Sequence, residues 1–322
     1  MADFESTSCP VCGSAESDLH REVPDRFNTD GPALFQLCRC AGCSMVYLNP
    51  RPVEEESQKY YQNEEYLPFS STREDRSAVN RIYGRIRTIN LHWKRRLVER
   101  FWRGGTARGP GTLLDVGCGT GEFLSTLGRA GWQVTGLERD ATASSWARKT
   151  LGLTVYTGDL GALPADARGY DVITLWHVLE HLYDPIAAVH RLAMLLKNDG
   201  FLLIALPNVN GIDAGAYGEN WIAYDTPRHL NHFSAKTLEQ LCSRANLEVL
   251  ARRQLPFDAP FNTLMSEQFS ARRSGSSALA WPFRILRAGF LTALSLAGGS
   301  RIFRAEHGAT LVFLFRHRRT GN

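Results

Sequence analysis

The chain has 322 residues, 43% of them hydrophobic and 22% charged, which is ordinary for a soluble globular protein with one large domain or two. It begins without the apolar stretch of a secretory signal, and it contains no run of about 18 uncharged apolar residues, so we expect a cytoplasmic protein without a membrane span. The net charge is +4, but residues 250–322 hold eleven arginines against three acidic residues. Such a basic end attracts nucleic acid, anionic lipid or a phosphorylated substrate, or it is simply a solvated surface.

Residues 1–52 are predicted to form a small zinc-ribbon module. C-P-V-C at 9–12 and C-A-G-C at 40–43 are pairs of thiols separated by 27 residues, somewhat more than is usual. Four thiolates suit tetrahedral Zn²⁺ in a closed structural site, which stabilises a segment too small for its own core. A redox role is the alternative. The predicted ligands are Cys9, Cys12, Cys40 and Cys43. Cys38 is assigned to a strand because only Cys40 has the two-residue spacing with Cys43.

Residues 53–111 are predicted to be a helical linker between this module and the rest of the chain. Apolar residues recur at spacings of three and four from Val79 to Phe101, which indicates an amphipathic helix. G-G-T-A-R-G-P-G at 104–111 is rich in glycine and is typical of a connecting segment. The remainder, residues 112–322, is predicted to be the main domain.

Strands and helices alternate through this main domain. Apolar runs predict strands at 112–116, 132–138, 154–156, 170–176, 201–206, 247–252 and 308–315. Helices are predicted at 122–130, 140–149, 185–197 and 235–245, with Asp140 and Asp184 as N-caps. The alternation predicts an α/β fold whose parallel sheet has helices on both faces. Ligands of such sheets bind beyond the carboxyl ends of the strands.

His177, Glu180 and His181 form the pattern H-x-x-E-H, which in one class of metalloprotease holds zinc from a single helix. Here the pattern lies between a strand ending near Trp176 and a helix capped at Asp184, which leaves room for at most one helical turn. We therefore interpret it as the wall of a ligand pocket and not as a protease metal site.

D-V-G-C-G-T-G at 115–121 joins the first strand to its helix. Its glycines allow a tight turn and close approach of a ligand, but their G-x-G-x-G spacing differs from the dinucleotide fingerprint. This argues against a nicotinamide-dependent oxidoreductase. The second strand ends at Glu138, where a carboxylate can accept both hydroxyls of a ribose, and Asp159 follows the third strand, within reach of an adenine amino group.

This combination resembles the class I S-adenosylmethionine-dependent methyltransferases. The resemblance implies a Rossmann-like seven-stranded sheet of order 3-2-1-4-5-7-6 with the last strand antiparallel, and S-adenosyl-L-methionine as cofactor. The implied cofactor residues are Asp115, Gly117, Cys118, Gly119, Gly121, Glu138, Arg139, Asp159, Leu160 and Trp176. Asp115 and the loop would hold the methionine end, while the Cys118 side chain is expected to pack and not to react. A Rossmann-like domain with an unused pocket is the alternative.

The cysteine module and the stretch W-I-A-Y-D-T-P-R-H-L-N-H-F-S at 221–234 resemble a group of zinc-containing bacterial methyltransferases of sugar, polysaccharide or secondary-metabolite pathways. This resemblance implies a small-molecule acceptor, including nucleotide-linked or lipid-linked sugars. Histidine has a suitable pKa for a general base acting on a hydroxyl acceptor. We expect His229 to be that base or to orient the acceptor, with His177, His181 and His232 as alternates. The competing interpretation is that these histidines only hydrogen-bond their neighbours.

Residues 258–305 are predicted to be an insertion, and 279–298 within it are apolar apart from two arginines. That stretch could lie at a membrane surface, cap the core or contact a second copy. A nucleic-acid methyltransferase or binding protein is the main functional alternative, but no basic groove interleaved with aromatic residues is evident. A catalytically silent interaction protein is a further one.

Overall fold

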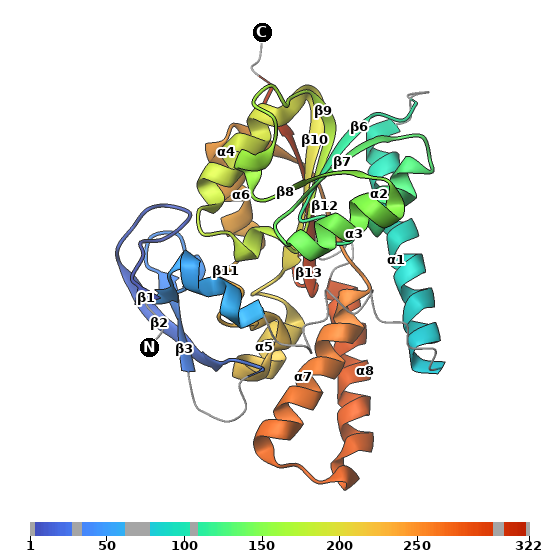
Figure 1. The fold of residues 1–322 in the computed structure, drawn as a ribbon. Helices are drawn as coiled ribbons and strands as arrows, with labels where there is room; N and C mark the ends of the chain where they lie inside the picture. Colours follow the sequence, from blue (N-terminus) through green and yellow to red (C-terminus); the bar gives the residue numbers. More distant parts are fainter. Residues whose placement is uncertain (1–3, 28–33, 62–77, 104–108, 299–305, 320–322) are drawn as a thin grey trace.

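A seven-stranded sheet forms the centre of the computed structural model, which describes residues 4–27, 34–61, 78–103, 109–298 and 306–319 (Figure 1). Its strands are β6 (Thr112–Val116), β7 (Gln133–Glu138), β8 (Thr154–Thr157), β9 (Tyr170–Trp176), β10 (Leu196–Pro207), β12 (Leu247–Gln254) and β13 (Thr310–His317). They lie in the order β12-β13-β10-β9-β6-β7-β8, and β13 is antiparallel to both of its neighbours. Counted along the chain this is 3-2-1-4-5-7-6, so the predicted order is confirmed.

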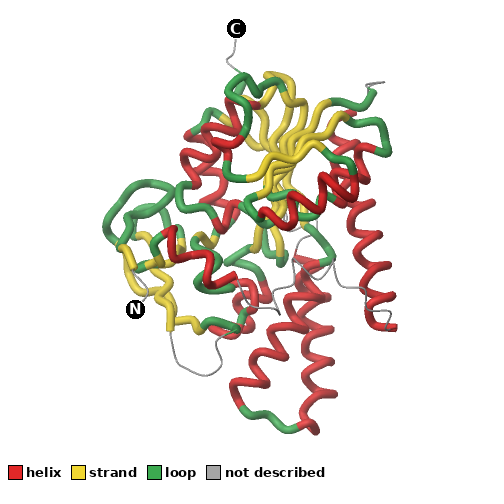
Figure 2. Tube along the Cα trace, in the orientation of Figure 1, coloured by secondary structure: helices red, strands yellow, loops and turns green. Residues whose placement is uncertain are grey.

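Helices cover both faces of the sheet (Figure 2). Because consecutive strand residues face opposite sides, neighbouring residues of one strand lie in two different cores. Leu113 packs with α1 (Ala78–Arg103), α2 (Glu122–Gly128) and α3 (Ala141–Leu151) in one core. Its neighbour Leu114 lies in the other core, with α4 (Pro185–Leu195) and α6 (Ala235–Arg244). The predicted N-caps form, since Asp140 accepts a hydrogen bond from Ala143 N at 2.7 Å and Asp184 accepts one from Ala187 N at 2.9 Å.

One local expectation was wrong. Helix α4 ends at Leu195 and β10 begins at Leu196, five residues early, because Leu196 pairs with Tyr170 of β9 before an irregularity in the ladder. Helix α1 packs on the core through buried Leu97 and Val98 and through partly buried Leu91 and Trp93, while Ile89 of the predicted apolar stripe is 57% exposed. Of the predicted linker and helical region, residues 62–77 and 104–108 lie outside the described residues.

The N-terminal module shares a sheet with the main domain. Strands β2 (Ser17–Pro24), β3 (Leu34–Cys40) and β4 (Val46–Leu48) are joined by β11 (Asn231–His232), from the segment that follows β10. A small pair, β1 (Phe4–Glu5) and β5 (Arg51–Pro52), and the 3₁₀ helix η1 (Glu54–Tyr61) complete the module. The pairing of β11 with β4 brings the segment rich in histidine against the module.

Between β12 and β13 two antiparallel helices, α7 (Asp258–Ser274) and α8 (Trp281–Gly298), project from the domain (Figure 1). They pack on each other and on the short α5 (Ile212–Tyr217). One side of α8 is buried, for example at Ala288 and Leu291, whereas Phe283 is 76% and Leu286 71% exposed. Thus α8 is not a fully buried cap. None of the helices in the described ranges is long and apolar enough to cross a membrane.

Candidate functional site

The loop between β6 and α2 is shaped by glycines in left-handed conformations. Gly117 has φ +70°, and a Cβ there would clash with Cγ2 of Val178. Gly119 has φ +56°, but a Cβ there would meet nothing within 4 Å. Position 117 therefore requires glycine both for its left-handed backbone conformation and because a side chain would not fit. At Gly119 the backbone faces open space, in which a ligand can approach it.

Three carboxylates stand at the carboxyl ends of adjacent strands beside this loop. Asp115 in β6 is buried and accepts a hydrogen bond from Thr174 Oγ1 at 2.6 Å; burial raises its pKa to about 7. Glu138 at the end of β7 accepts one backbone N–H on each oxygen, from Gly119 at 2.7 Å and from Asp140 at 2.8 Å. Asp159, after β8, is exposed and caps a short 3₁₀ turn. Each carboxylate oxygen has a second lone pair, so these acids can still accept hydroxyl and amino donors.

The other residues predicted at the cofactor pocket have distinct surroundings. Cys118 is buried with its thiol towards Gly136 and Leu124, and burial raises its thiol pKa, as expected for a packing residue. Arg139 is exposed and pairs with Glu54 at 3.0 Å, and Leu160 packs on the core. Trp176, at the end of β9, lies edge-on to Phe123 and has Lys94 Nζ 4.4 Å from its ring centroid.

His177 occupies the turn after β9 with φ +58° and bridges two carboxylates. Its Nε2 lies 2.9 Å from Asp258 Oδ2, and its Nδ1 lies 3.3 Å from Glu180 Oε1. Burial lowers the pKa of His177, but Asp258 and Glu180 outweigh that effect and raise it to about 10. The ring is therefore an imidazolium at neutral pH. Sequence reasoning did not single out Asp258, whose only local signal is its place in the first turn of α7.

The other three predicted histidines lie together around Glu180. His181 belongs to the 3₁₀ turn Leu179–His181, and its ring centroid is 4.6 Å from that of His229. The ring of His232 is 6.4 Å from that of His229. Burial lowers the pKa of His229 to about 4 and that of His232 to about 3, so both are neutral at pH 7. The single turn also confirms that H-x-x-E-H does not lie along one helix.

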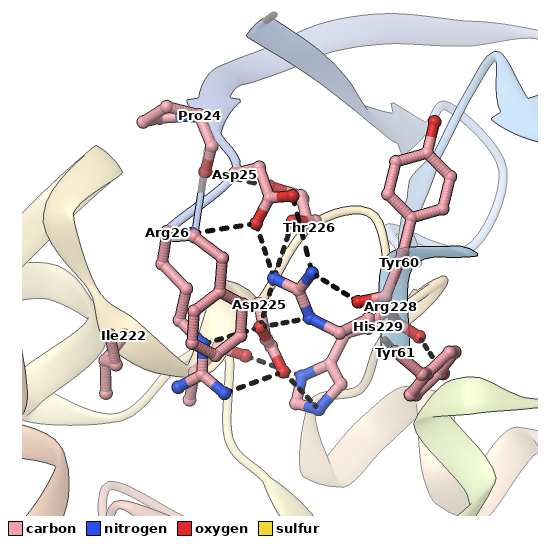
Figure 3. A network of polar contacts seen from close by, with 12 residues as sticks. Pro24, Asp25, Arg26, Tyr60, Tyr61, Ile222, Asp225, Thr226, Arg228 and His229 are labelled. Atoms are coloured by element: carbon pink, nitrogen blue, oxygen red, sulfur yellow. Dashed lines mark hydrogen bonds and ion pairs between the residues drawn. The ribbon is translucent and has the colours of Figure 1, made fainter. Parts of the chain in front are cut away.

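A buried arginine fixes the segment that carries His229 (Figure 3). Arg228 Nη2 lies 2.7 Å from Asp25 Oδ1, its Nε donates to Asp225 Oδ1 at 2.8 Å, and its guanidinium also reaches two backbone carbonyls. Burial raises the pKa of Asp225, but Arg26 and Arg228 outweigh it and hold that pKa well below its usual range. Because Asp25 belongs to the N-terminal module, this network ties the module to the histidines.

The part of the chain that contains the glycine loop and the three acids is similar to a known protein family. Residues 86–252, just over half of the chain, match the family model described as a methyltransferase domain. The chain belongs to this methyltransferase family. The match runs from α1 into β12 and includes all four predicted histidines.

Curated relatives of this methyltransferase are similar over a shorter stretch. A ubiquinone biosynthesis O-methyltransferase from Pectobacterium atrosepticum is 38% identical over 104 residues, 30% of this chain and 43% of the relative. Another, from Albidiferax ferrireducens, is 28% identical over 45% of this chain and 63% of its own length. The chain thus spans less than two thirds of each. The solved structure of the plantazolicin methyltransferase BpumL aligns with 82% of this chain and 95% of that one, at 16% identity and a TM-score of 0.49.

Outside the methyltransferase match, the four predicted cysteine ligands converge. Cys9 Sγ lies 3.5 Å from Cys43 Sγ, Cys12 Sγ lies 3.4 Å from Cys40 Sγ, and all four sulfurs are within 4.8 Å of one another. Zn–S bonds of about 2.3 Å in a tetrahedron require sulfurs about 3.8 Å apart, so the donor set fits the ion. Cys38 lies in β3, outside the cluster, as predicted.

Proposed function

We propose that the protein is an S-adenosylmethionine-dependent methyltransferase that methylates a small-molecule acceptor. The observation that carries this proposal is the alignment of Asp115, Glu138 and Asp159 with the glycine loop, at the carboxyl ends of three adjacent strands. Membership of the methyltransferase family supports it. The closed four-cysteine cluster supports a structural Zn²⁺ in the N-terminal module.

The cofactor, when bound, supplies a methyl group already activated on a sulfonium. In the proposed arrangement Asp115 and the loop backbone hold its methionine end, Glu138 accepts from the ribose hydroxyls and Asp159 from the adenine amino group. The protein then contributes mainly alignment of the acceptor with the methyl carbon. The open space before Gly119 and the unused lone pairs of Glu138 support this assignment.

On the acceptor side, His229 is the proposed general base. Its Nδ1 lies 2.8 Å from the carbonyl oxygen of Ala223, which holds the proton on Nδ1 and leaves the Nε2 lone pair to take a proton from a hydroxyl. His181 and His232 are alternates, whereas His177, an imidazolium between two carboxylates, is better suited to orienting an acceptor.

The acceptor is proposed to be a hydroxyl of a sugar or polysaccharide precursor, or of a secondary-metabolite precursor. The resemblance of the zinc module supports the sugar class, and the names of the ubiquinone O-methyltransferase relatives support oxygen as the methylated atom. A lipid-linked acceptor is favoured by the exposed apolar side of α8, which carries Phe283, Leu286 and Phe290. Arg287 on the same helix is 47% exposed and pairs with Glu267.

Contact of α8 with a membrane surface can be tested by flotation with anionic liposomes at low salt. The wild type should float with the vesicles, and a variant carrying Asp at Phe283, Leu286 and Phe290 should remain in the lower fraction. If the wild type also remains there, the membrane-surface proposal is wrong.

The activity itself is tested by incubating purified protein with methyl-labelled S-adenosylmethionine and a host extract. Label in the small-molecule or lipid fraction supports the proposal, whereas label that disappears on nuclease treatment supports a nucleic-acid methyltransferase. His229→Gln should abolish turnover while sparing binding of the methyl donor, because the ring lies on the acceptor side. His190→Gln, an equal change at an exposed histidine of α4, is the matched control. Turnover retained by His229→Gln would remove His229 from the mechanism.

A further inference from the structure

We infer that Glu180, His181 and His229 form a binding site for a divalent transition-metal ion, separate from the four-cysteine cluster. At least one ligand atom from each residue lies within 4.8 Å of the other two. Glu180 and His181 come from the 3₁₀ turn after β9, and His229 comes from the segment before β11, 48 positions later in the sequence. Bonds of about 2.0–2.2 Å from nitrogen and oxygen to such an ion require only small side-chain movements from this arrangement.

Both imidazoles are held in the orientation that metal-binding histidines adopt. His181 Nδ1 lies 2.9 Å from the carbonyl oxygen of Arg228, and His229 Nδ1 lies 2.8 Å from that of Ala223. A carbonyl accepts a hydrogen bond and cannot donate one, so each Nδ1 carries the proton and the lone pair of each ring is on Nε2. Nε2 of His229 lies 3.9 Å from Asp225 Oδ2, which is too long for a hydrogen bond. Fixing of the ring through its other nitrogen is the usual support around a metal-bound histidine.

The carboxylate of Glu180 lacks the partners that its burial demands. The residue is 1% exposed, and among the described residues neither of its oxygens accepts a hydrogen bond; Oε1 has only the ion pair with His177 at 3.3 Å. A buried carboxylate without hydrogen bonds is costly unless it is paired or coordinates a metal. His177 is itself shared with Asp258, whose Oδ2 lies 2.9 Å from its Nε2, so Glu180 does not have this ring to itself.

Two imidazoles and one carboxylate make a donor set that suits zinc, cobalt or ferrous iron and leaves coordination positions open. The H-x-x-E-H pattern would use His177 and His181 as ligands. The inferred site uses Glu180, His181 and His229, because the ring of His177 is held by Asp258. If the proposed function is correct, an acceptor hydroxyl bound at an open position would lose its proton more easily. Nε2 of His229 would then be a ligand and not the base, and the two roles make different predictions for metal dependence.

Cobalt is the probe that separates this site from the cysteine cluster. Purified full-length protein carrying one equivalent of Zn²⁺ is titrated with Co²⁺ and followed by visible absorption. We expect one further equivalent to bind, with ligand-field bands but without the thiolate-to-cobalt charge-transfer band of a cysteine site. Glu180→Gln and His229→Gln should each weaken Co²⁺ binding by about tenfold or more, and His190→Gln should bind as the wild type does.

Circular dichroism of each variant shows whether it is folded, and if Glu180→Gln does not fold, His229→Gln alone carries the test. No cobalt beyond the cysteine cluster, or equal binding by the wild type and a folded variant, would overturn the inference. Binding of S-adenosylmethionine is measured on the same samples. Donor binding without cobalt binding contradicts only the metal site, whereas cobalt binding without donor binding contradicts only the proposed function.

Discussion

Arg228→Leu should destabilise the protein strongly by leaving a buried carboxylate without its cation. The Arg228 side chain is fully buried, and the Asp25 side chain facing it is 8% exposed. Asp225 keeps Arg26 at 2.8 Å, so the uncompensated charge falls on Asp25. Removing one partner of a buried ion pair costs about 3–5 kcal/mol. The carbonyl oxygens of Tyr60 and Thr226 also lose a donor. We expect a loss of about 4 kcal/mol in the free energy of unfolding.

Urea denaturation followed by tryptophan fluorescence measures this loss. Adding Asp25→Asn to Arg228→Leu should recover part of it, because the second change removes the unpaired charge. Arg21→Leu is the matched control: its ion pair with Glu219 is 3.5 Å long and a third or more exposed on both sides, so it should cost less than about 1 kcal/mol. An Arg228→Leu variant within about 1 kcal/mol of the wild type would refute the assignment of Arg228 as the tie between the module and the histidine segment.

Three further predictions concern other parts of the molecule. Gly117→Ala should lower the free energy of unfolding by about 1–3 kcal/mol, and Gly119→Ala by less, since both have positive φ but only Gly117 lacks room for a Cβ; equal losses in urea denaturation would contradict this. Cys12→Ser should abolish zinc retention in metal analysis and open the N-terminal module to limited proteolysis, and full zinc content would refute the assigned cluster. The raised pKa of His177 predicts stabilisation that is complete below about pH 6.5 and is lost as the pH rises through about 10. Urea denaturation across that range should show the loss in the wild type and little of it in Asp258→Asn.

The geometry around the proposed cofactor residues was largely predictable, because its signals are local. Glycine spacing marks a loop that needs left-handed backbone at Gly117, and an apolar run ending in Glu138 places that acid at a strand end whatever the rest of the chain does. The N-caps at Asp140 and Asp184 formed for the same reason, since a cap needs only a side chain and a backbone N–H three residues later.

The proposed acceptor side was predictable in its residue types but not in their contacts. Four histidines were singled out, yet the pattern holds no information that His177 meets Asp258, 81 positions later, or that Glu180 lies beside His229 without a hydrogen bond from any described residue to its carboxylate. Charge states depend on such neighbours, so the structure makes one histidine an imidazolium and two others neutral.

By itself, then, the sequence determined the strands, their helices, the glycine loop and the two cysteine pairs, because periodicity and turn chemistry act over a few residues. Only the tertiary structure decided that β11 extends the sheet of the N-terminal module and that Asp25 pairs with Arg228. These contacts join residues far apart in the sequence. Their formation depends on the path of the whole chain, and no short pattern encodes that path.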